Sequence, residues 1–325
     1  MDRLHSMRVF SRVIEAGSFA AAARELNLSP AVVTRLVADL EDHLGARLMN
    51  RTTRRLALTD TGELYLERVR HILAEIDDAE ALASAATAEP RGHLRVLSPP
   101  AFAVHQLAKH LPGFRASHPL VTLELSVPGP VETVDENFDV SIIQVTRPLA
   151  DGDFVARLLA CSEVIICASP EYLERHGRPA HPHEMPQHEV MTPPFVREII
   201  LHSGLFGDDE PAGESVTLLP TRSALSTSHI DTMYAAALGG LGVAGLPSFV
   251  VEDALLEHAL ERVLPEWHML TSTVYAAMPT RKHVPARTRA FVDFLVKTFG
   301  GENRDPWLLA AGCETAAPKA QPDQK

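Results

Sequence analysis

A dense group of arginines near the start of the chain is the first candidate for chemistry. It places Arg47, Arg51, Arg54 and Arg55 within nine residues. The first sixty residues carry nine arginines, no lysine and seven acidic residues, although the whole 325-residue chain has a formal charge of −12. Because guanidinium groups donate to phosphates and to guanine edges, this local excess favours an anionic partner. Scattered charge on a solvated loop is the alternative interpretation.

A helix upstream of these arginines carries a second set of candidate residues. Ser29 and Pro30 are typical of an N-cap and a first helical residue, and Gly45 is typical of a helix end. The apolar stripe of this helix consists of Val33, Leu36, Val37, Leu40 and Leu44. At 100° per residue the opposite face carries Ala31, Thr34, Arg35 and Ala38. Slim residues with one hydroxyl and one guanidinium suit a helix that enters the major groove of DNA.

The elements around this helix complete a small domain. Helices are expected over residues 3–15 and 19–26, and a short turn joins the second helix to the one that starts at Pro30. Residues 48–59 have apolar ends around a basic centre, which predicts a hairpin or wing. The acids Asp39, Glu41 and Asp42 are expected to point away from a duplex. The pattern indicates a helix-turn-helix, with an ordinary three-helix bundle as the alternative.

Two long strings, FSRVIEAGSFAAAARELN and LSPAVVTRLVADLEDHLGARLMNRTTRRLALTDTG, strongly resemble the LysR-type transcriptional regulator family. The resemblance covers residues 1–62 and continues more loosely to about residue 299. It departs from the usual pattern at Thr34, where Ser is frequent, and at Leu36, where Gln is frequent. It implies a winged helix-turn-helix in which Thr34 and Arg35 contact bases, and Ala31 and Val32 contact thymine methyl groups. The implied phosphate contacts are Ser29, Arg51, Thr52, Thr53, Arg54 and Arg55.

A long helix is predicted after this domain, over residues 60–89, where there is no proline and a single glycine. Asp60 to Glu63 looks like a capping box. Apolar residues then recur at heptad spacing, at Tyr65, Val69, Ile72, Ile76, Ala79, Ala83 and Ala86. Such a seam indicates a partner helix, so a homodimer or homotetramer is expected. A helix packed only on its own domain is the alternative.

From residue 93 onward, short apolar strands alternate with helices, which predicts an α/β domain. Strands are expected over residues 94–97, 121–125, 139–143, 155–158, 164–168, 242–246 and 274–277. Helices are expected over residues 102–117, 170–176, 231–239, 248–256 and 286–299. The segments GHLRVLSPP, ENFDVSIIQV, CASPEYLERHG and AALGGLGVAGLP resemble the effector domain of the same family.

This second resemblance implies a fold like that of type II periplasmic binding proteins, with a cleft for a small molecule between two lobes. The predicted fold class is therefore multidomain α and α/β. Its predicted parts are a winged helix-turn-helix (1–59), a linker helix (60–89), lobe I (93–161 and 269–300), lobe II (162–268) and a disordered tail (301–325). Crossovers are placed near residues 161–163 and 267–269. The predicted effector contacts are Ser98, Pro99, Pro100, Phe102, Gln144, Thr146, Thr192, Ser226, Thr227 and Gly245.

Three other motifs are interpreted as structural. Gly240 to Gly245 matches GxGxxG, but a nucleotide site needs a strand before the glycines and a helix after them, and here the order is reversed. His181, His183 and His188 lie in a proline-rich stretch without a helical ligand pair, so no metal is predicted. Cys161 and Cys167 are interpreted as buried thiols, with redox sensing as the alternative. Trp307 to Leu309 is a candidate docking patch within the tail.

The composition and charge exclude several classes of protein. No apolar run is long enough to span a membrane, and polar residues interrupt the first ten positions, so no signal peptide is expected. The predicted protein is a cytoplasmic, non-enzymatic transcriptional regulator without a cofactor. Its predicted partners are double-stranded promoter DNA, a small organic acid or aromatic effector, a second copy of the chain and RNA polymerase. A metabolite-binding protein or nucleotide-dependent enzyme with an N-terminal helical module is the alternative.

Overall fold

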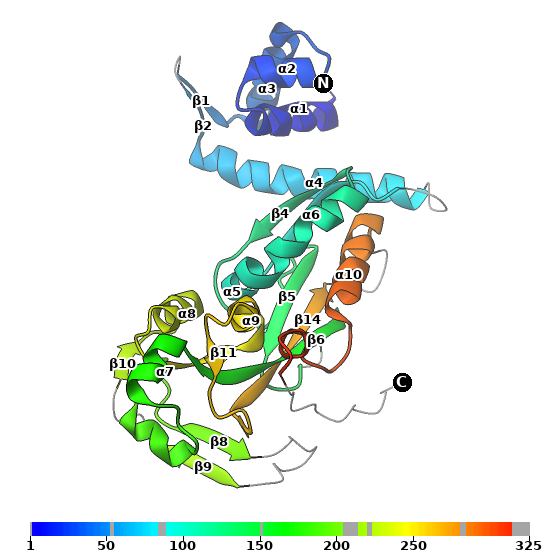
Figure 1. Cartoon of the computed structure of the whole chain (residues 1–325). Helices are drawn as coiled ribbons and strands as arrows, with labels where there is room; N and C mark the ends of the chain where they lie inside the picture. Colours follow the sequence, from blue (N-terminus) through cyan, green and yellow to red (C-terminus); the bar gives the residue numbers. More distant parts are fainter. Residues whose placement is uncertain are drawn as a thin grey trace. The chain divides into compact units, whose positions relative to one another are not determined.

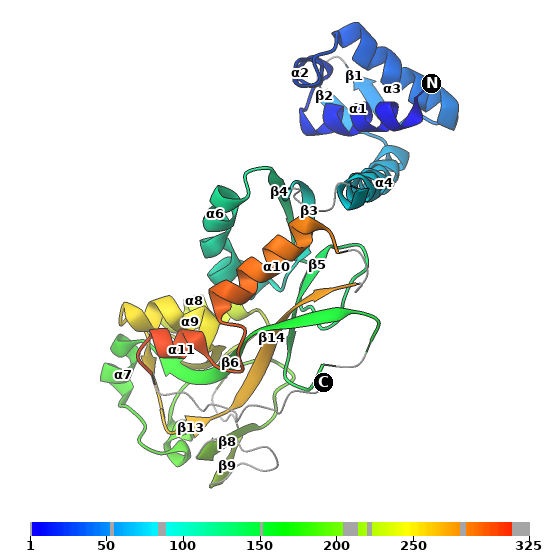
Figure 2. The same ribbon diagram turned by 90° about the vertical axis from the view of Figure 1, so that its right-hand side faces the viewer.

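The computed structural model describes residues 2–52, 55–83, 89–149, 152–203, 214–219, 223–279 and 284–313. The chain divides into two compact units, Met1–Gly92 and His93–Lys325. Figure 1 and Figure 2 show the elements of each unit in two perpendicular views.

The N-terminal unit is a winged helix-turn-helix followed by a long helix (Figure 1). Its elements are α1 (Arg3–Glu15), α2 (Phe19–Glu25), α3 (Pro30–Leu44), β1 (Met49–Thr52), β2 (Arg55–Leu58) and α4 (Asp60–Ala83). The predicted N-caps are confirmed, because the hydroxyls of Ser18 and Ser29 accept the N–H groups of Ala21 and Val32 at 3.1 and 3.3 Å. Gly45 ends α3 with φ at 64°, a conformation that favours glycine.

The core of this unit is formed by one face of each short helix. Val9, Phe10 and Val13 of α1 pack with small residues of α2 and with the stripe of α3. That stripe is confirmed at its buried positions, Val33, Val37 and Leu40, and Leu36 is partly buried beside them. The prediction is wrong for Leu44, which is exposed as the last residue of the helix.

The start of α4 differs from the predicted capping box by one residue. The hydroxyl of Thr59, not Asp60, accepts the N–H of Gly62 at 2.9 Å, and the Thr59 carbonyl accepts the N–H of Glu63. A Cβ at Gly62 would collide with the carbonyl oxygen of Leu48. Glycine is therefore required where the first turn of α4 lies against the backbone that leads into the hairpin.

The predicted heptad seam on α4 begins inside its own unit. The rings of Tyr65 and Phe10 lie 6.0 Å apart, and Leu66 is buried in the same core. Further along, Ile72 is exposed and Ile76 is partly buried. The seam side chains from Ala79 onward lie outside the described residues. The first turn of the seam thus stabilises the fold of a single chain.

The C-terminal unit is built on a main sheet with the strand order β10-β7-β11-β6-β14-β5-β3-β4, and β12 pairs with β6. We call β5, β3 and β4 the first half of this sheet, and β11, β7 and β10 the second half. Pairing is parallel between β3 and β5, β7 and β10, and β7 and β11. The strands are β3 (Gly92–Leu97), β4 (Val121–Ser126), β5 (Val140–Val145), β6 (Val155–Ala168), β7 (Val190–Thr192), β10 (Ser223–Ser226), β11 (Val243–Pro247), β12 (Glu261–Arg262) and β14 (Leu270–Met278).

The two halves are joined by the antiparallel pair β6 and β14, which runs through both (Figure 2). The prediction of two strands over 155–158 and 164–168 is wrong, because they form one continuous strand of 14 residues. The first predicted crossover, residues 161–163, lies in the middle of β6. The second connection is β14 itself, which begins just after the predicted 267–269.

Helices cover the main sheet, and three predicted helices match the observed bounds. The predicted helix over 102–117 is instead α5, a π-helical turn at Ala103–Leu107, and α6 in succession. The helices are α5 (Pro100–Phe102), α6 (Ala108–Ser117), α7 (Pro170–His176), α8 (Ile230–Leu238), α9 (Ser248–Leu256), α10 (Ala286–Phe299) and α11 (Pro306–Ala310), with a 3-10 turn at Pro182–Gln187.

A second sheet of three strands was not predicted. Its order is β13-β8-β9, with β8 (Ile199–Ser203), β9 (Ser215–Leu218) and β13 (Trp267–His268) all antiparallel. β13, β9 and β8 have two, four and five residues, and the longest apolar run among them is Ile199–Leu201 of β8, which is shorter than the runs of about 4–8 residues that identify a strand.

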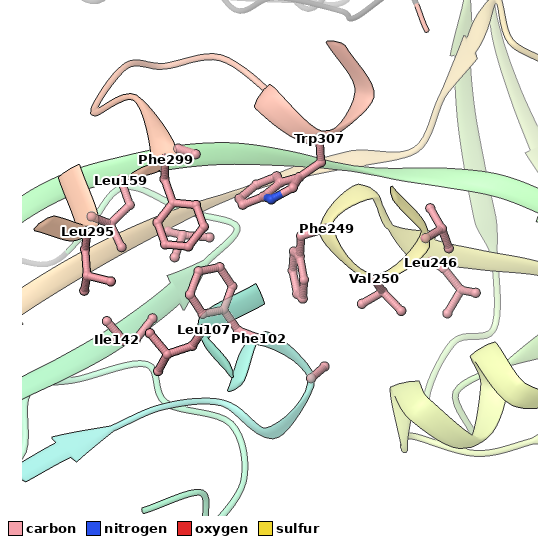
Figure 3. Close-up of a cluster of buried hydrophobic side chains, with 14 of the residues drawn as sticks. Phe102, Leu107, Ile142, Leu159, Leu246, Phe249, Val250, Leu295, Phe299 and Trp307 are labelled. Atoms are coloured by element: carbon pink, nitrogen blue, oxygen red, sulfur yellow. The ribbon is translucent and has the colours of Figure 1, made fainter. Parts of the chain in front are cut away.

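The expectation of a disordered tail from residue 301 is wrong as far as residue 313; residues 314–325 lie outside the described residues. Asp305 caps α11, accepting the N–H groups of Trp307 and Leu308 at 3.1 and 3.0 Å. Both of these side chains are buried, so they belong to the core and not to a docking patch. Figure 3 shows the Trp307 ring directed toward three phenylalanines, with centroids 5.7 to 6.3 Å away: Phe102, Phe249 and Phe299. Burial of this aromatic surface offsets the cost of ordering the segment.

We expect Trp307→Ala to lower the stability of the C-terminal unit by about 3–5 kcal/mol, because it leaves a cavity among three phenylalanines. Urea unfolding followed by the fluorescence of Trp267, the other tryptophan of the chain, measures this directly. Leu309→Ala is the matched control, since Leu309 lies on the same short helix but is 53% exposed. Equal losses for the two variants would contradict a core role for α11.

Candidate functional site

The exposed face of α3 presents the side chains predicted from the helical pattern. Ala31, Val32 and Arg35 are exposed, and Thr34 is partly buried between them. The Arg35 side chain is 83% exposed. The opposite face is fixed against α1 and α2 by the buried stripe, so the packing of the domain decides which residues α3 presents outward.

The polar atoms on this face have defined partners. The Thr34 hydroxyl donates to the Pro30 carbonyl at 2.8 Å, which leaves its oxygen lone pairs and its methyl group for an outside contact. The Arg35 Nε lies 3.9 Å from the Asp39 carboxylate, one helical turn later. An exposed pair at this distance is worth little, so a phosphate or a base edge can replace Asp39 as the partner.

The predicted hairpin is confirmed by the pairing of β1 with β2. Its antiparallel register runs from Met49 opposite Leu58 to Thr52 opposite Arg55. Of the predicted contacts here, Thr53 and Arg54 lie outside the described residues. For Arg51, Thr52 and Arg55 only the backbone is described, and it places all three next to the tip.

The base of the hairpin is attached to both neighbouring helices. Glu41 of α3 is 6% exposed, and its Oε1 accepts the N–H groups of Leu48 and Met49 at 2.8 and 3.1 Å. From the start of α4, Thr59 donates its hydroxyl to the Arg47 carbonyl at 2.7 Å and its N–H to the Leu48 carbonyl at 3.0 Å. The sequence pattern predicts that Glu41 points away from a duplex, but it does not predict that backbone amides bind this carboxylate inside the domain. We call Arg47–Met49 the wing base.

In the C-terminal unit, the carboxyl ends of the parallel strands meet at the middle of β6. At the end of β5, Val145 lies opposite Thr273 of β14, which in turn lies opposite Cys161 of β6. At the end of β11, Pro247 lies opposite Val164 of β6. The two halves therefore direct their strand ends toward one short stretch, where α/β sheets of this kind bind ligands.

The predicted effector contacts of the first half lie at these strand ends. Ser98 and Pro99, at the end of β3, are buried, and the Ser98 hydroxyl donates to the Pro99 carbonyl at 3.2 Å. Pro100 is partly buried and Thr146 is exposed. The Gln144 side chain is partly buried and donates to the Ser272 hydroxyl at 3.0 Å.

The predicted contacts of the second half form a smaller group. Ser226 lies opposite Thr192 in the parallel pair of β10 and β7, and the N–H of Thr227 donates to the Thr192 carbonyl at 3.2 Å. Gly245 lies on β11, where a Cβ would come within 3.0 Å of the Met269 sulfur. Three predicted hydroxyl residues are thus brought together, and a glycine at position 245 leaves room for Met269.

Phe102 does not belong with these residues. It is fully buried and packs edge-on against Phe249 at 5.4 Å, in the cluster of Figure 3. Its position shortly after the end of β3 suggested a ligand contact, but α5 turns the ring into the hydrophobic core. Phe102 is therefore a core residue and lies outside the candidate site.

Buried hydroxyls that the sequence analysis missed continue from Gln144 across the middle of β6 and β14. The Ser272 hydroxyl donates to the Ser162 carbonyl at 3.4 Å, and the Ser162 and Ser248 hydroxyls lie 2.8 Å apart. Serines within apolar strand runs were the available signal. These serines come together only through the pairing of β6 with β14, which places Ser272 opposite Ser162.

An ionic group lies beside these hydroxyls. Glu163 is buried, and its Oε2 lies 3.1 Å from Nδ1 of the buried His268 and 3.5 Å from the guanidinium of Arg262, whose side chain is 6% exposed. A buried carboxylate needs such partners, because desolvation alone would disfavour its charge.

Asp305 completes the arrangement from the C-terminal segment. Three hydrogen bonds join this segment to the edge of β6 away from β14. The Leu159 carbonyl accepts the N–H of Gly301 at 2.9 Å. The backbone N–H of Cys161 donates to the Arg304 carbonyl at 2.8 Å, and that of Glu163 donates to Asp305 Oδ2 at 2.8 Å. Burial raises the pKa of Asp305 to about 6, because the loss of hydration outweighs the hydrogen bonds from Ser248 and from the backbone of Glu163 and Leu308.

The other motifs have structural explanations. His181 stacks on His183 and meets the edge of Trp267, while His188 bonds the Tyr172 hydroxyl at 3.4 Å. Gly240 and Gly242 lie between α8 and β11, and Gly245 lies within β11, so the helix precedes the glycines and the strand follows, the reverse of the order in a nucleotide site. Cys161 and Cys167 are buried, and burial raises the pKa of both thiols, that of Cys167 to about 12.

The described part of the chain contains neither a metal-binding cluster nor a membrane-spanning helix. Within residues 2–313, apart from the gaps given above, no three His, Cys, Asp or Glu side chains gather as a metal site would require. Among the helices that the structure describes, none combines the length and the apolar character needed to cross a bilayer.

Two protein-family profiles match the chain, one on each unit. The bacterial regulatory helix-turn-helix family named after lysR matches residues 4–63. The LysR substrate binding domain matches residues 87–300. The segment that carries Asp305 and α11 lies beyond the second match.

Similar proteins match over nearly the whole length. An HTH-type transcriptional repressor of Pseudomonas aeruginosa is 32% identical over 92% of this chain and 93% of its own. The HTH-type transcriptional regulator CrgA of Neisseria meningitidis is 33% identical over 90% and 96%. The solved structure of CrgA, a LysR-type regulator, has a TM-score of 0.54 at 29% identity and covers 91% of this chain and 98% of its own. The full-length Vibrio cholerae virulence activator AphB, at 24% identity over 91% and 99%, shares the fold with a TM-score of 0.55.

We expect the contribution of Asp305 to the stability of the C-terminal unit to fall as the pH rises from about 4 to about 6. The folded-state pKa of Asp305, about 6, lies above the ordinary value of 3.8, so folding favours the protonated form. The penalty for ionisation is absent below the ordinary value and complete above the folded one, and its full size is about 3 kcal/mol. Urea unfolding of the wild type and Asp305→Asn between pH 4 and 7.5 measures it.

The difference in free energy of unfolding between the wild type and Asp305→Asn should therefore change between pH 4 and about 6. Glu302→Gln is the control, because Glu302 is an exposed carboxylate three residues earlier, with its side chain 63% exposed. A difference between the wild type and Asp305→Asn that stays constant from pH 4 to 7.5 would contradict the raised pKa.

Proposed function

The chain belongs to the LysR family of bacterial transcriptional regulators, and from this premise we propose that its N-terminal unit binds double-stranded promoter DNA under the control of a small organic effector in its C-terminal unit. The predicted family and the predicted pairing of a helix-turn-helix with a substrate-binding domain are both confirmed. Regulators of this family bind promoter DNA and small-molecule effectors. The finer assignments below are our proposals for this chain.

The observation that supports the DNA interface best is the exposed face of α3 beside an arginine-bearing hairpin. In our proposal Thr34 and Arg35 contact base edges, and Ala31 and Val32 lie against thymine methyl groups. Because Thr34 already donates to Pro30, it contributes an acceptor and a methyl group. The proposed phosphate contacts are Ser29, Arg51, Thr52, Thr53, Arg54 and Arg55.

The effector site is proposed at the strand ends that meet at the middle of β6. Its residues are the earlier candidates without Phe102, namely Ser98, Pro99, Pro100, Gln144, Thr146, Thr192, Ser226, Thr227 and Gly245. Hydroxyls and an amide among apolar neighbours suit an organic acid or a hydroxylated aromatic compound. A thermal-shift screen of such compounds tests this site, with Gln144→Ala as the variant that should lose the stabilisation.

The two activities are coupled if the effector binds one arrangement of the molecule more tightly than another. We propose a winged domain at 1–59, a linker helix at 60–89, and lobes at 93–161 with 269–300 and at 162–268. The linker helix is proposed to pair with a second copy, giving a dimer or a tetramer. The protein would act in the cytoplasm, without catalysis, and RNA polymerase is a further proposed partner.

We expect Arg35→Ala to weaken binding to the cognate site by about 1–3 kcal/mol and to relax specificity, because a base contact is lost. Gel-shift titrations compare a footprinted fragment from upstream of the gene with random duplex DNA of equal length. Equal losses on both duplexes would show that Arg35 does not read bases.

Arg54→Gln should weaken binding to all sequences alike, because phosphate contacts carry no sequence information. The slope of log affinity against log salt concentration should become shallower by about 0.9 for the lost contact. Titrations at four or more salt concentrations measure the slope. Arg178→Gln is the control, since it removes one arginine from the C-terminal unit, and a slope change of the same size there would contradict the assignment.

A further inference from the structure

Glu41, which binds the wing base, lies on the same side of α3 as Thr34, one of the proposed base-reading residues. Glu41 follows Thr34 by seven residues, which on an α-helix is about 10 Å along the axis and about 20° around it. The carboxylate that binds the wing base is therefore aligned with the side chain proposed to contact DNA. A hairpin that starts here extends beside the groove that α3 would enter.

The hydrogen bonds of the wing base divide between two helices. The Glu41 carboxylate of α3 accepts the N–H groups of Leu48 and Met49, at 2.8 and 3.1 Å. From the other side, Thr59 binds the carbonyls of Arg47 and Leu48 at 2.7 and 3.0 Å. Thr59 thus fixes the wing base to α4, while Glu41 fixes it to the helix that is proposed to read DNA.

We propose that Glu41 is a positioning residue, which directs the hairpin so that its basic tip reaches the phosphates beside the groove occupied by α3. This inference rests on the proposed DNA-binding function. A carboxylate near DNA would ordinarily oppose binding. Here two buried backbone N–H groups bind it, and it acts through the hairpin.

The salt dependence of binding distinguishes positioning from a general loss of folded protein. Each phosphate contact contributes about 0.9 to the slope of log affinity against log salt concentration, whereas partial unfolding lowers affinity without changing the slope. For Glu41→Ala we expect the slope to become shallower by about 1 to 2. Affinity at 0.15 M salt should fall about 10- to 100-fold.

Two further variants of the full chain test whether the shallower slope of Glu41→Ala comes from the loss of the two hydrogen bonds or from the loss of a negative charge. Glu41→Gln retains an oxygen that can accept both bonds, so its slope should stay close to that of the wild type. Asp42→Ala removes the same formal charge from an exposed position on the next residue, and its slope should equal that of the wild type. Combined with Arg54→Gln, Glu41→Ala should produce less than the sum of the separate effects, because both remove the same contacts.

These experiments distinguish a failure of the inference about Glu41 from a failure of the proposed DNA-binding function. A wild-type slope for Glu41→Ala, or a slope for Glu41→Gln as shallow as that of Glu41→Ala, would overturn the inference. Fully additive effects with Arg54→Gln would overturn it as well. A wild-type protein that does not bind duplex DNA at any salt concentration would instead overturn the proposed function. Circular dichroism and thermal unfolding of Glu41→Ala show whether the folded fraction accounts for its affinity.

Discussion

A backbone N–H group that is withdrawn from water needs an acceptor. In this protein two buried acidic residues supply such acceptors, one at the wing base and one at the middle of β6. Glu41 accepts two amides where the hairpin leaves α3. Asp305 accepts the amide of Glu163 at the middle of β6 and two more at the start of α11. Without these acceptors, the wing base and the edge of β6 away from β14 would each contain buried, unsatisfied N–H groups. The arrangement of both candidate sites therefore depends on these carboxylates.

The C-terminal segment gives the middle of the main sheet a third connection beside β6 and β14. Residues 301–305 bond along the edge of β6 that β14 leaves unpaired, and Trp307 then packs against phenylalanines of α5, α9 and α10. Phe249 follows β11 in the second half, whereas Phe102 follows β3 in the first. If the two halves of the main sheet move relative to each other about β6 and β14, the packing of Trp307 between Phe102 and Phe249 must change or move with one of the halves. An effector could act on such a movement only by its different affinity for the two arrangements.

Much of the candidate DNA-binding surface could be predicted, because the helix ends and the buried stripe that define it are local features. Ser18, Ser29, Pro30 and Gly45 specify helix ends through their own backbone and side-chain preferences, and a period of 3.6 residues separates the buried face of α3 from its exposed face. The role of Glu41 could not be predicted, because nothing in its neighbours distinguishes an exposed acid from one that accepts amides seven and eight residues later. Phe102 was assigned to the wrong site for the same reason, since its proximity to a strand end says nothing about the direction of the ring.

The sequence alone determined the bounds of α7, α9 and α10, the concentration of arginine in the first unit and the family resemblance, since each of these depends on residues that are neighbours in the chain. Only the tertiary structure decided that β6 is one strand, that β8, β9 and β13 form a sheet, and that residues 301–313 are ordered. Gln144 meets Ser272, and Glu163 meets Asp305, across more than a hundred residues. Such contacts are determined by the packing of the whole unit, because local conformational preferences extend over only a few residues.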